Sequence, residues 1–358
     1  MAVGSYEKFI ASMKSGQIGN LYIFHGEERY LLEHSLVDIR RRLCPGGLDG
    51  FNYKRFEGKE IRVDDLDDAI NILPVFAERT LIEVHDFDVF KGKKSAEQEI
   101  AEAPASSKKS KTAEKDDKQH LVDIFADLPD YVCLVIVYDT IQYKPDGRTK
   151  LDKEIMERAQ IVEFKVQEQA KLIKWISRHF DAAGKRIGKS EAEYLALITD
   201  GYMTALETEI KKVSAYCSSD VVTRGDIDAV VTPALNAFAY KLTDAILGRK
   251  HESAMQILDE LMQMREPPHK IIYSISLKMR QFLAARVCIE ENLSKKELID
   301  MCGIRFDFQA TALINAARKT TLEVCRDAVL LCAEAAYDLN STSEPEARLI
   351  ELVARFAV

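Results

Sequence analysis

The residues nearest to a known chemical motif lie at positions 21–32, where a short apolar run leads into Gly26 and then into a helical pattern. A strand, a glycine turn and a helix are the setting of a P-loop, whose pattern Gly-x-x-x-x-Gly-Lys-Ser/Thr wraps phosphates in backbone N–H groups and holds Mg²⁺. Residues 26–32 read GEERYLL, so the second glycine, the lysine and the hydroxyl are absent. Glu27 and Glu28 would also repel a triphosphate from the helix N-terminus. We therefore predict the architecture of a nucleotide-binding fold without its nucleotide site.

Other residues capable of chemistry stand alone. Asp139 follows an apolar strand without the glutamate that a water-activating pair needs, so we interpret it as a turn residue. The acidic run at 64–68 complements the positive end of a helix better than it forms a cation site. The seven cysteines include no Cys-x-x-Cys pair, and the seven histidines show no metal-binding spacing. We predict no catalytic residue, no metal site and no cofactor.

Apolar residues occupy a loop that should be polar. Pro74 ends a helical pattern that reaches Leu73, yet residues 73–79 read LPVFAER, with Val75 and Phe76 beside two charged residues. The residues alone favour packing of Phe76 beneath the sheet. The alternative is a protruding plug for a pocket in a partner protein, since burying a Val or Phe side chain contributes about 1.5–3 kcal/mol.

Alternating strands and helices would position both features. One helical pattern at 30–43 follows the glycine turn, and another, capped by Asp64 or Asp65, precedes Pro74. Strands are predicted at residues 21–25, 52–57, 80–85, 131–138 and 161–166. The strand at 131–138 is apolar on both faces, as central strands of parallel sheets are. This order indicates an α/β fold with a parallel sheet and helices on both sides.

Three domains are predicted: an α/β domain at 1–166, a small helical domain at 167–231 and an all-α domain at 232–358. The first contains a mixed-charge segment at about 91–119, interpreted as a flexible insertion, with a basic DNA-contacting arm as the alternative. Helices of the last domain are predicted at 234–247, 252–264, 269–291, 295–301, 309–318, 322–339 and 345–356.

The overall charge argues against a protein that coats nucleic acid. Lys and Arg number 50 against 58 Asp and Glu, for a net charge of -8, whereas such proteins are usually basic. No apolar run is long enough to span a membrane, and residues 1–16 lack a secretion-signal pattern. The unpaired, odd number of cysteines is typical of reduced thiols. We expect a cytoplasmic protein.

Runs in all three domains, in their order and spacing, resemble the delta-subunit family of bacterial DNA polymerase III clamp loaders. They are residues 21–32 (LYIFHGEERYLL), 55–58 (RFEG), 73–79 (LPVFAER), 162–165 (VEFK), 241–247 (KLTDAIL), 257–261 (ILDEL), 266–267 (EP) and 280–282 (RQF). The resemblance covers nearly the whole chain except the insertion. It implies an AAA+-type α/β module without ATPase activity, then a helical lid at 167–231 and an oligomerising helical collar at 232–358. Many delta chains carry an arginine shortly after Gly201, where this chain has Thr204.

The resemblance also implies a function and partners. The subunit would grip the sliding clamp (beta) and hold it open at one interface for loading onto primed DNA, with no ATPase or polymerase activity of its own. The family's gripping residues correspond to Phe76 and Val75, supported by Leu73, although the family often has a bulkier residue than valine at the first anchor. The collar would join the ATP-binding subunits (gamma/tau) and delta prime in a ring that approaches primer-template DNA.

Two other classes stay open. One is a P-loop-like ATPase with an atypical phosphate loop. The other is a DNA-binding replication or repair scaffold that uses Arg40, Arg41, Arg42 and the lysines of the insertion. The three arginines are equally explained as the solvated C-terminal end of a helix, where cations are favourable.

Overall fold

The computed structural model describes residues 4–45, 49–58, 61–87, 111–138, 143, 147–233, 235–341 and 344–356. The chain forms two compact units, Met1–Val166 and Gln167–Val358. Most of the predicted insertion, and the predicted turn residue Asp139, lie outside the described residues. Within the described ranges, no helix has the length and apolar character needed to cross a bilayer.

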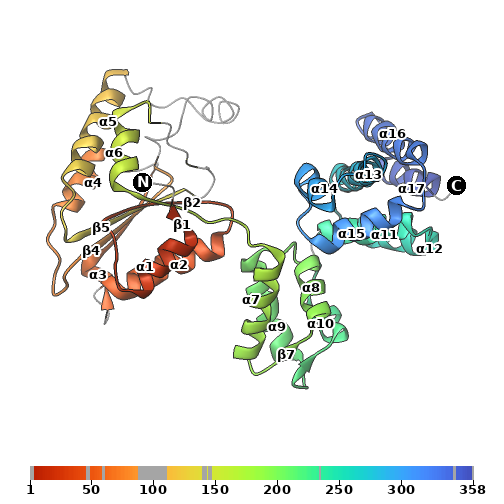
Figure 1. Cartoon of the computed structure of the whole chain (residues 1–358), viewed down its shortest axis with the longest axis horizontal. Helices are drawn as coiled ribbons and strands as arrows, with labels where there is room; N and C mark the ends of the chain where they lie inside the picture. Colours follow the sequence, from red (N-terminus) through yellow and green to blue (C-terminus); the bar gives the residue numbers. More distant parts are fainter. Residues whose placement is uncertain are drawn as a thin grey trace. The chain divides into compact units, whose positions relative to one another are not determined.

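A six-stranded sheet forms the centre of the first unit (Figure 1). Its strands are β1 (Gly4–Ser5), β2 (Leu21–His25), β3 (Tyr53–Glu57), β4 (Thr80–His85), β5 (Val132–Tyr138) and β6 (Gln160–Glu163). Neighbouring strands pair in parallel in the order β1-β6-β2-β5-β4-β3. The strand β5 is buried at every position, because it lies between β2 and β4 and both its faces are covered. The predicted parallel α/β fold is confirmed.

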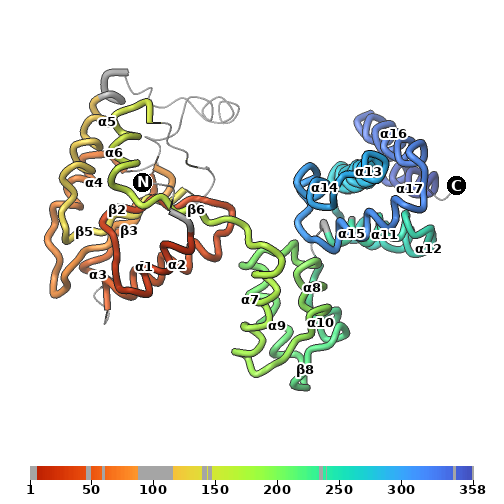
Figure 2. The backbone as a smooth tube through the Cα atoms, in the orientation of Figure 1, coloured from red at the N-terminus to blue at the C-terminus, as the bar shows by residue number. Residues whose placement is uncertain are grey.

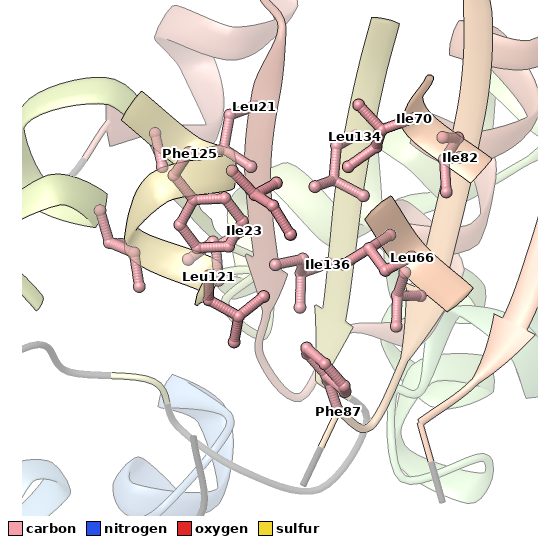
Figure 3. Close-up of a cluster of buried hydrophobic side chains, with 14 of the residues drawn as sticks. Leu21, Ile23, Leu66, Ile70, Ile82, Phe87, Leu121, Phe125, Leu134 and Ile136 are labelled. Carbon is pink, nitrogen blue, oxygen red and sulfur yellow. The ribbon is translucent and has the colours of Figure 1, made fainter. Parts of the chain in front are cut away.

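Helices cover both faces of this sheet. They are α1 (Tyr6–Lys14), α2 (Arg29–Leu43), α3 (Asp49–Asn52), α4 (Val63–Ile70), α5 (Lys111–Ala126) and α6 (Lys150–Arg158). On one face, α4 and α5 pack against strand residues such as Ile23, Ile82 and Ile136 (Figure 3), and α6 joins the same core. On the other face, α1 and α2 pack against Phe24 and Val135. Alternate residues of β2, β4, β5 and β6 therefore belong to two different cores.

The helix before the apolar loop differs from its prediction at both ends. It ends at Ile70 rather than Leu73, with Asn71 as its C-cap. Its N-cap is Arg62 rather than Asp64 or Asp65, because Asp65 lies one turn into the helix and accepts a hydrogen bond from the Arg62 N–H at 3.1 Å. The early end lengthens the irregular segment before β4.

Other differences concern elements with weak sequence signals. The last part of the predicted insertion, from Lys111, is helical because it continues α5, which Leu121 and Phe125 fix to the core. The strand predicted to start at Asn52 starts one residue later, since Asn52 ends the short helix α3. Helices α1, α3, α5 and α6 were not predicted.

The second unit is mostly helical (Figure 2). Its helices are α7 (Gln169–Ala182), α8 (Lys189–Ile198), α9 (Met203–Tyr216), α10 (Arg224–Val230), α11 (Leu235–Leu247), α12 (His251–Gln263), α13 (Pro268–Glu290), α14 (Lys295–Cys302), α15 (Asp307–Ala317), α16 (Leu322–Asp338) and α17 (Pro345–Arg355). Two short strands, β7 (Arg186–Ile187) and β8 (Val221–Val222), also pair in parallel, so residues 167–231 are not purely helical as predicted.

The long helix α13 organises the rest of this unit. Its first half, with Ile275 and Met279, packs in one buried cluster with residues of α11, α12, α16 and α17. Its second half, with Ala285 and Cys288, packs in another with residues of α14 and α15. The seven helices predicted beyond residue 232 are present, with ends shifted by at most two residues. The predicted boundary at 231/232 falls inside the second unit and stays a prediction.

Candidate protein-docking site

Residues 71–79 connect α4 to β4 and carry the apolar residues that the sequence singled out. Because the strands are parallel, this loop lies at the edge of the sheet where strands begin. The side chains of Leu73, Val75 and Phe76 are 67%, 38% and 93% exposed. The interpretation that Phe76 packs beneath the sheet is therefore wrong. Binding of a partner by these residues stays a prediction.

A buried asparagine fixes the backbone beside Phe76. The Asn52 amide accepts a hydrogen bond from the Val75 N–H through Oδ1 and donates one to the Val75 carbonyl through Nδ2, each at 2.7 Å. Asn52 is fully buried at the end of α3. Two bonds to one residue fix both its position and its orientation. The loop is thus held at its centre as well as at its ends.

Phe76 has a backbone conformation that phenylalanine rarely adopts. Its φ is +54°, in the left-handed region. That region costs an L-residue about 1–2 kcal/mol, and bulky residues seldom occupy it without support from their surroundings. Here the support is the Asn52 clamp on Val75, the preceding residue. The backbone therefore directs the largest apolar side chain of the loop outward, where it does not pack in the protein's own core.

Arg79 fixes the other end of the loop. Its guanidinium donates to the carbonyl oxygens of Ile18 (2.7 Å), Gly19 (2.9 Å) and Val132 (2.8 Å), and to Oδ1 of Asn20 (2.7 Å). These acceptors precede β2 or begin β5, so one side chain ties the loop to the starts of two central strands. The loop is therefore anchored to the most buried part of the sheet.

Two further exposed apolar residues escaped sequence reasoning. Ile72 precedes Leu73 in the loop, and Phe51 precedes Asn52 in α3; both side chains are exposed. Neither carries a signal of its own, because an apolar residue at a helix end is usually buried. Grouped apolar exposure of this kind is typical of a surface that binds another protein. Chemically, the loop can bury apolar surface against a partner.

Charged side chains of α2 and β4 interact with other groups of the same unit. Tyr53 donates from its hydroxyl to Glu83 at 2.9 Å, and burial, together with the Glu83 charge, raises the pKa of Tyr53 to about 12. The Arg40 guanidinium lies 4.6 Å from the centre of the Tyr53 ring. Arg42 donates to the Met13 carbonyl at 2.6 Å. Two of the three arginines considered for DNA binding thus make contacts within this unit.

The altered phosphate loop lies at the opposite edge of the sheet, where β2 ends. Gly26 has a φ of +135°, and a Cβ there would collide with the backbone of Phe164. The Glu28 N–H, which a P-loop would direct at phosphate, donates to the Phe164 carbonyl at 3.0 Å. The Glu28 side chain itself is buried at the start of α2. The Phe164 carbonyl, just after β6, thus takes an N–H donor that a phosphate would need, and the Glu28 carboxylate places a negative charge where the phosphate would bind.

Two further features concern metal binding and the position of Thr204. Within the described ranges, no group of three or more His, Cys, Asp or Glu side chains is arranged to hold a metal ion. Thr204 lies in the first turn of α9 and is exposed, whereas its neighbour Met203 is buried. A threonine at this position has no cationic group to offer a phosphate.

Two family models match the chain. The model described as "DNA polymerase III, delta subunit" matches residues 22–165, and the model described as "DNA polymerase III delta subunit, C-terminal domain" matches residues 236–355. The first contains the apolar loop and the altered phosphate loop, and the second contains helices α11 to α17 apart from Leu235, the first residue of α11.

Curated relatives and a solved structure agree with these matches. The DNA polymerase III subunit delta of Bacillus subtilis is 25% identical over 345 residues, which cover 95% of this chain and 93% of the relative. The probable subunit delta of Aquifex aeolicus is 20% identical and covers 80% and 77%. The structure of the Bacillus subtilis DNA clamp loader delta protein superposes with a TM-score of 0.58 at 21% identity, covering 97% of this chain and 98% of the other.

Proposed function

The chain belongs to the DNA polymerase III delta subunit family, and we propose that it binds the sliding clamp and opens it for loading onto primed DNA. The clamp-loader role itself follows from the family. The clamp contacts we propose are Phe76, Val75 and Leu73. The observation that carries this proposal is the 93% exposure of Phe76 on a loop fixed by Asn52 and Arg79.

Apolar burial would supply the affinity. Transfer of a Phe or Leu side chain from water into a pocket contributes about 1.5–3 kcal/mol each. A central aromatic anchor commonly dominates an interface of this kind. The fixed loop adds to this because little conformational entropy is lost on binding when the backbone is already ordered. Val75, which is only partly exposed, would contribute less than Phe76.

Opening of the clamp requires more than affinity. A ligand shifts an equilibrium between two states only if it binds one of them more tightly. We propose that the α/β unit behind the loop fits the open clamp interface and fits the curvature of the closed ring poorly. The binding energy of Leu73 and Phe76 would then be used to stabilise the open ring.

The ATP that regulates clamp binding would be bound by other subunits of the loader. The buried Glu28 carboxylate lies at the start of α2, and the Glu28 N–H is bonded to the Phe164 carbonyl, so this donor is not available to a triphosphate. We propose that ATP bound by the gamma/tau subunits controls access of the clamp to Phe76. Titration with a fluorescent ATP analogue tests this part: no saturable binding at the loop of residues 26–32 is expected at micromolar concentrations, and saturable binding that a substitution in this loop abolishes would support the atypical ATPase instead.

The second unit would join this chain to the other subunits of the clamp loader. We propose that residues 167–231 form the lid and residues 232–358 the collar, which joins delta prime and the ATP-binding subunits. Primer-template DNA would be met inside the assembled loader, in the cytoplasm. Arg40 and Arg42 already contact Tyr53 and Met13, which makes a DNA-binding role for the isolated chain less favourable.

A comparison of two clamp forms tests opening separately from binding. The cognate clamp is prepared as a closed ring and as a variant whose ring interface is weakened by substitution. Opening predicts tighter binding to the weakened ring, because less work is spent on the interface. Equal affinity for both forms would leave clamp binding intact but exclude opening by this chain.

A further inference from the structure

A polar cavity lies within the second unit, and none of the proposed clamp contacts lines it. Its volume is about 200 Å³. The turn between α8 and α9 forms one wall, with Asp200 and Tyr202. Helix α13 forms another, with Ser274 and Lys278, and the segment from Gly303 to Gln309 closes it. Sites for drug-sized ligands usually occupy about 300–1,000 Å³, so this cavity suits a small ligand.

The walls of the cavity are fixed by Arg305. Its guanidinium donates to the carbonyl oxygens of Asp200 and Gly201, the latter at 2.7 Å, and lies 4.8 Å from the centre of the Tyr202 ring. Gly201 has a φ of +65°, and a Cβ there would come within 2.7 Å of the Phe306 ring. The close approach of these two segments therefore requires glycine, and the cavity is formed before any ligand binds.

Lys278 provides a cation that is not in direct contact with a carboxylate of the described residues. Its ammonium donates to Gln281 Oε1 at 3.1 Å and lies 5.7 Å from the centre of the Tyr240 ring. In the described part of the chain it forms no ion pair. Burial lowers the pKa of Lys278, an effect that the negative charge of Asp200 partly offsets. An ammonium group has three donors, so donors remain for a ligand.

Two buried polar side chains line the same cavity without a protein partner. Ser274 is 7% exposed and Gln309 is 9% exposed. Their side chains make no hydrogen bond with any part of the chain that the structure describes. Buried polar groups in folded proteins nearly always have a partner, so these two donors are suited to a ligand. With Lys278 they supply one ammonium, one hydroxyl and one amide.

We propose that this cavity binds a small phosphate-type oxyanion through Lys278, Ser274 and Gln309. Lys278 and Arg305 against Asp200 give the cavity a net positive charge. An oxyanion has enough acceptor oxygens for all three donors, and charge-assisted hydrogen bonds to it are the strong ones. The phosphate could come from inorganic phosphate or from a nucleotide, and the two sources share this chemistry. The site does not depend on the proposed clamp function.

Calorimetric titration of the full chain with inorganic phosphate, pyrophosphate and thymidine monophosphate, at constant ionic strength, tests the proposal. We expect one saturable site for at least one probe, with a dissociation constant below about 1 mM. A preference for thymidine monophosphate over phosphate would identify a nucleotide as the source, and the reverse preference would identify the free ion. Absence of saturable binding for all three probes would overturn the proposal.

Variants distinguish binding in this cavity from binding to other cationic side chains. Lys278→Met should weaken binding by about tenfold or more, since it removes a charged hydrogen bond. Lys270→Met, on an exposed lysine of the same helix α13, is the matched control and should change nothing. Gln309→Leu tests the site without removing charge and should also weaken binding. Binding that Lys278→Met and Gln309→Leu both leave unchanged, in variants whose circular dichroism matches the wild type, would also overturn the proposal.

Discussion

The Asn52 side chain bonds to both backbone groups of Val75: Oδ1 accepts from the Val75 N–H and Nδ2 donates to the Val75 carbonyl, each at 2.7 Å. The two residues are 23 positions apart, and the first is fully buried. Phe76 follows Val75 directly, so the asparagine determines where the exposed phenylalanine is presented. Asn52 is therefore a positioning residue for a surface that it does not itself form.

Asn52→Ala should weaken clamp binding several-fold although every proposed contact residue remains. It should also lower the free energy of unfolding by about 1–3 kcal/mol, because the Val75 N–H and carbonyl lose their partners. Asn340→Ala, at an exposed asparagine after α16 in the second unit, is the control and should leave clamp affinity unchanged. Surface plasmon resonance and urea unfolding measure the two effects. Wild-type affinity in a folded Asn52→Ala variant would show that clamp binding does not depend on the backbone position that Asn52 fixes.

Substitutions of Phe76 distinguish effects on stability from effects on binding, because the side chain is exposed and the backbone is strained. Glycine adopts a φ near +54° without steric cost, whereas alanine does not. Phe76→Gly should therefore be more stable than Phe76→Ala by about 1 kcal/mol, while both lose clamp affinity. Chemical denaturation of the two variants measures the difference. Greater stability of the alanine variant would mean that the loop does not hold residue 76 in the left-handed region.

The start of α14 gives a pH dependence. Glu297 accepts hydrogen bonds from the backbone N–H of Ser294 (2.7 Å) and from its hydroxyl (2.8 Å), and these bonds lower the pKa of Glu297. A lowered pKa in the folded state contributes stability that is present above the unfolded pKa and is lost as pH falls through the folded one. Glu297→Gln should thus lower the thermal midpoint at pH 7, and the difference should shrink below the ordinary glutamate pKa of about 4.3.

Scanning calorimetry from pH 7 to pH 3 measures this change, with Glu291→Gln, an exposed residue outside the capping box, as the control. Ser294→Ala, which removes the helix cap from the same box, should lower the midpoint by about 2–4 °C at neutral pH. A Glu297→Gln deficit that stays constant over the whole pH range would contradict the assigned bonds.

Periodicity predicted the fold where apolar patterns are strong. The central strand β5 follows from a short continuous apolar run, and the helices beyond residue 232 follow from apolar residues at helical spacing. The two-stranded pair of β7 and β8 was missed because two residues carry no period. Lys111 and its neighbours were read as a loop because their composition is polar, although Leu121 and Phe125 further along hold the helix in place.

The candidate site was predictable in its residues but not in its geometry. Val75 and Phe76 stand out because apolar residues follow Pro74 where a polar loop is expected. Whether Phe76 points inward or outward depends on the bonds from Asn52, a contact between distant positions that periodicity cannot reveal. The residues alone favoured burial, which was wrong, and only the family resemblance favoured exposure. Phe51 and Ile72 were missed for the same reason.

The central claim is that Phe76 docks into the sliding clamp, and equilibrium binding of the cognate clamp without nucleotide tests it most directly. The three chains to compare are wild type, Phe76→Ala and Tyr337→Ala, the last removing another exposed aromatic side chain, from the second unit. We expect Phe76→Ala to weaken binding by about 2 kcal/mol or more, roughly 30-fold, with Tyr337→Ala unchanged. Wild-type affinity in a folded Phe76→Ala variant would contradict the account.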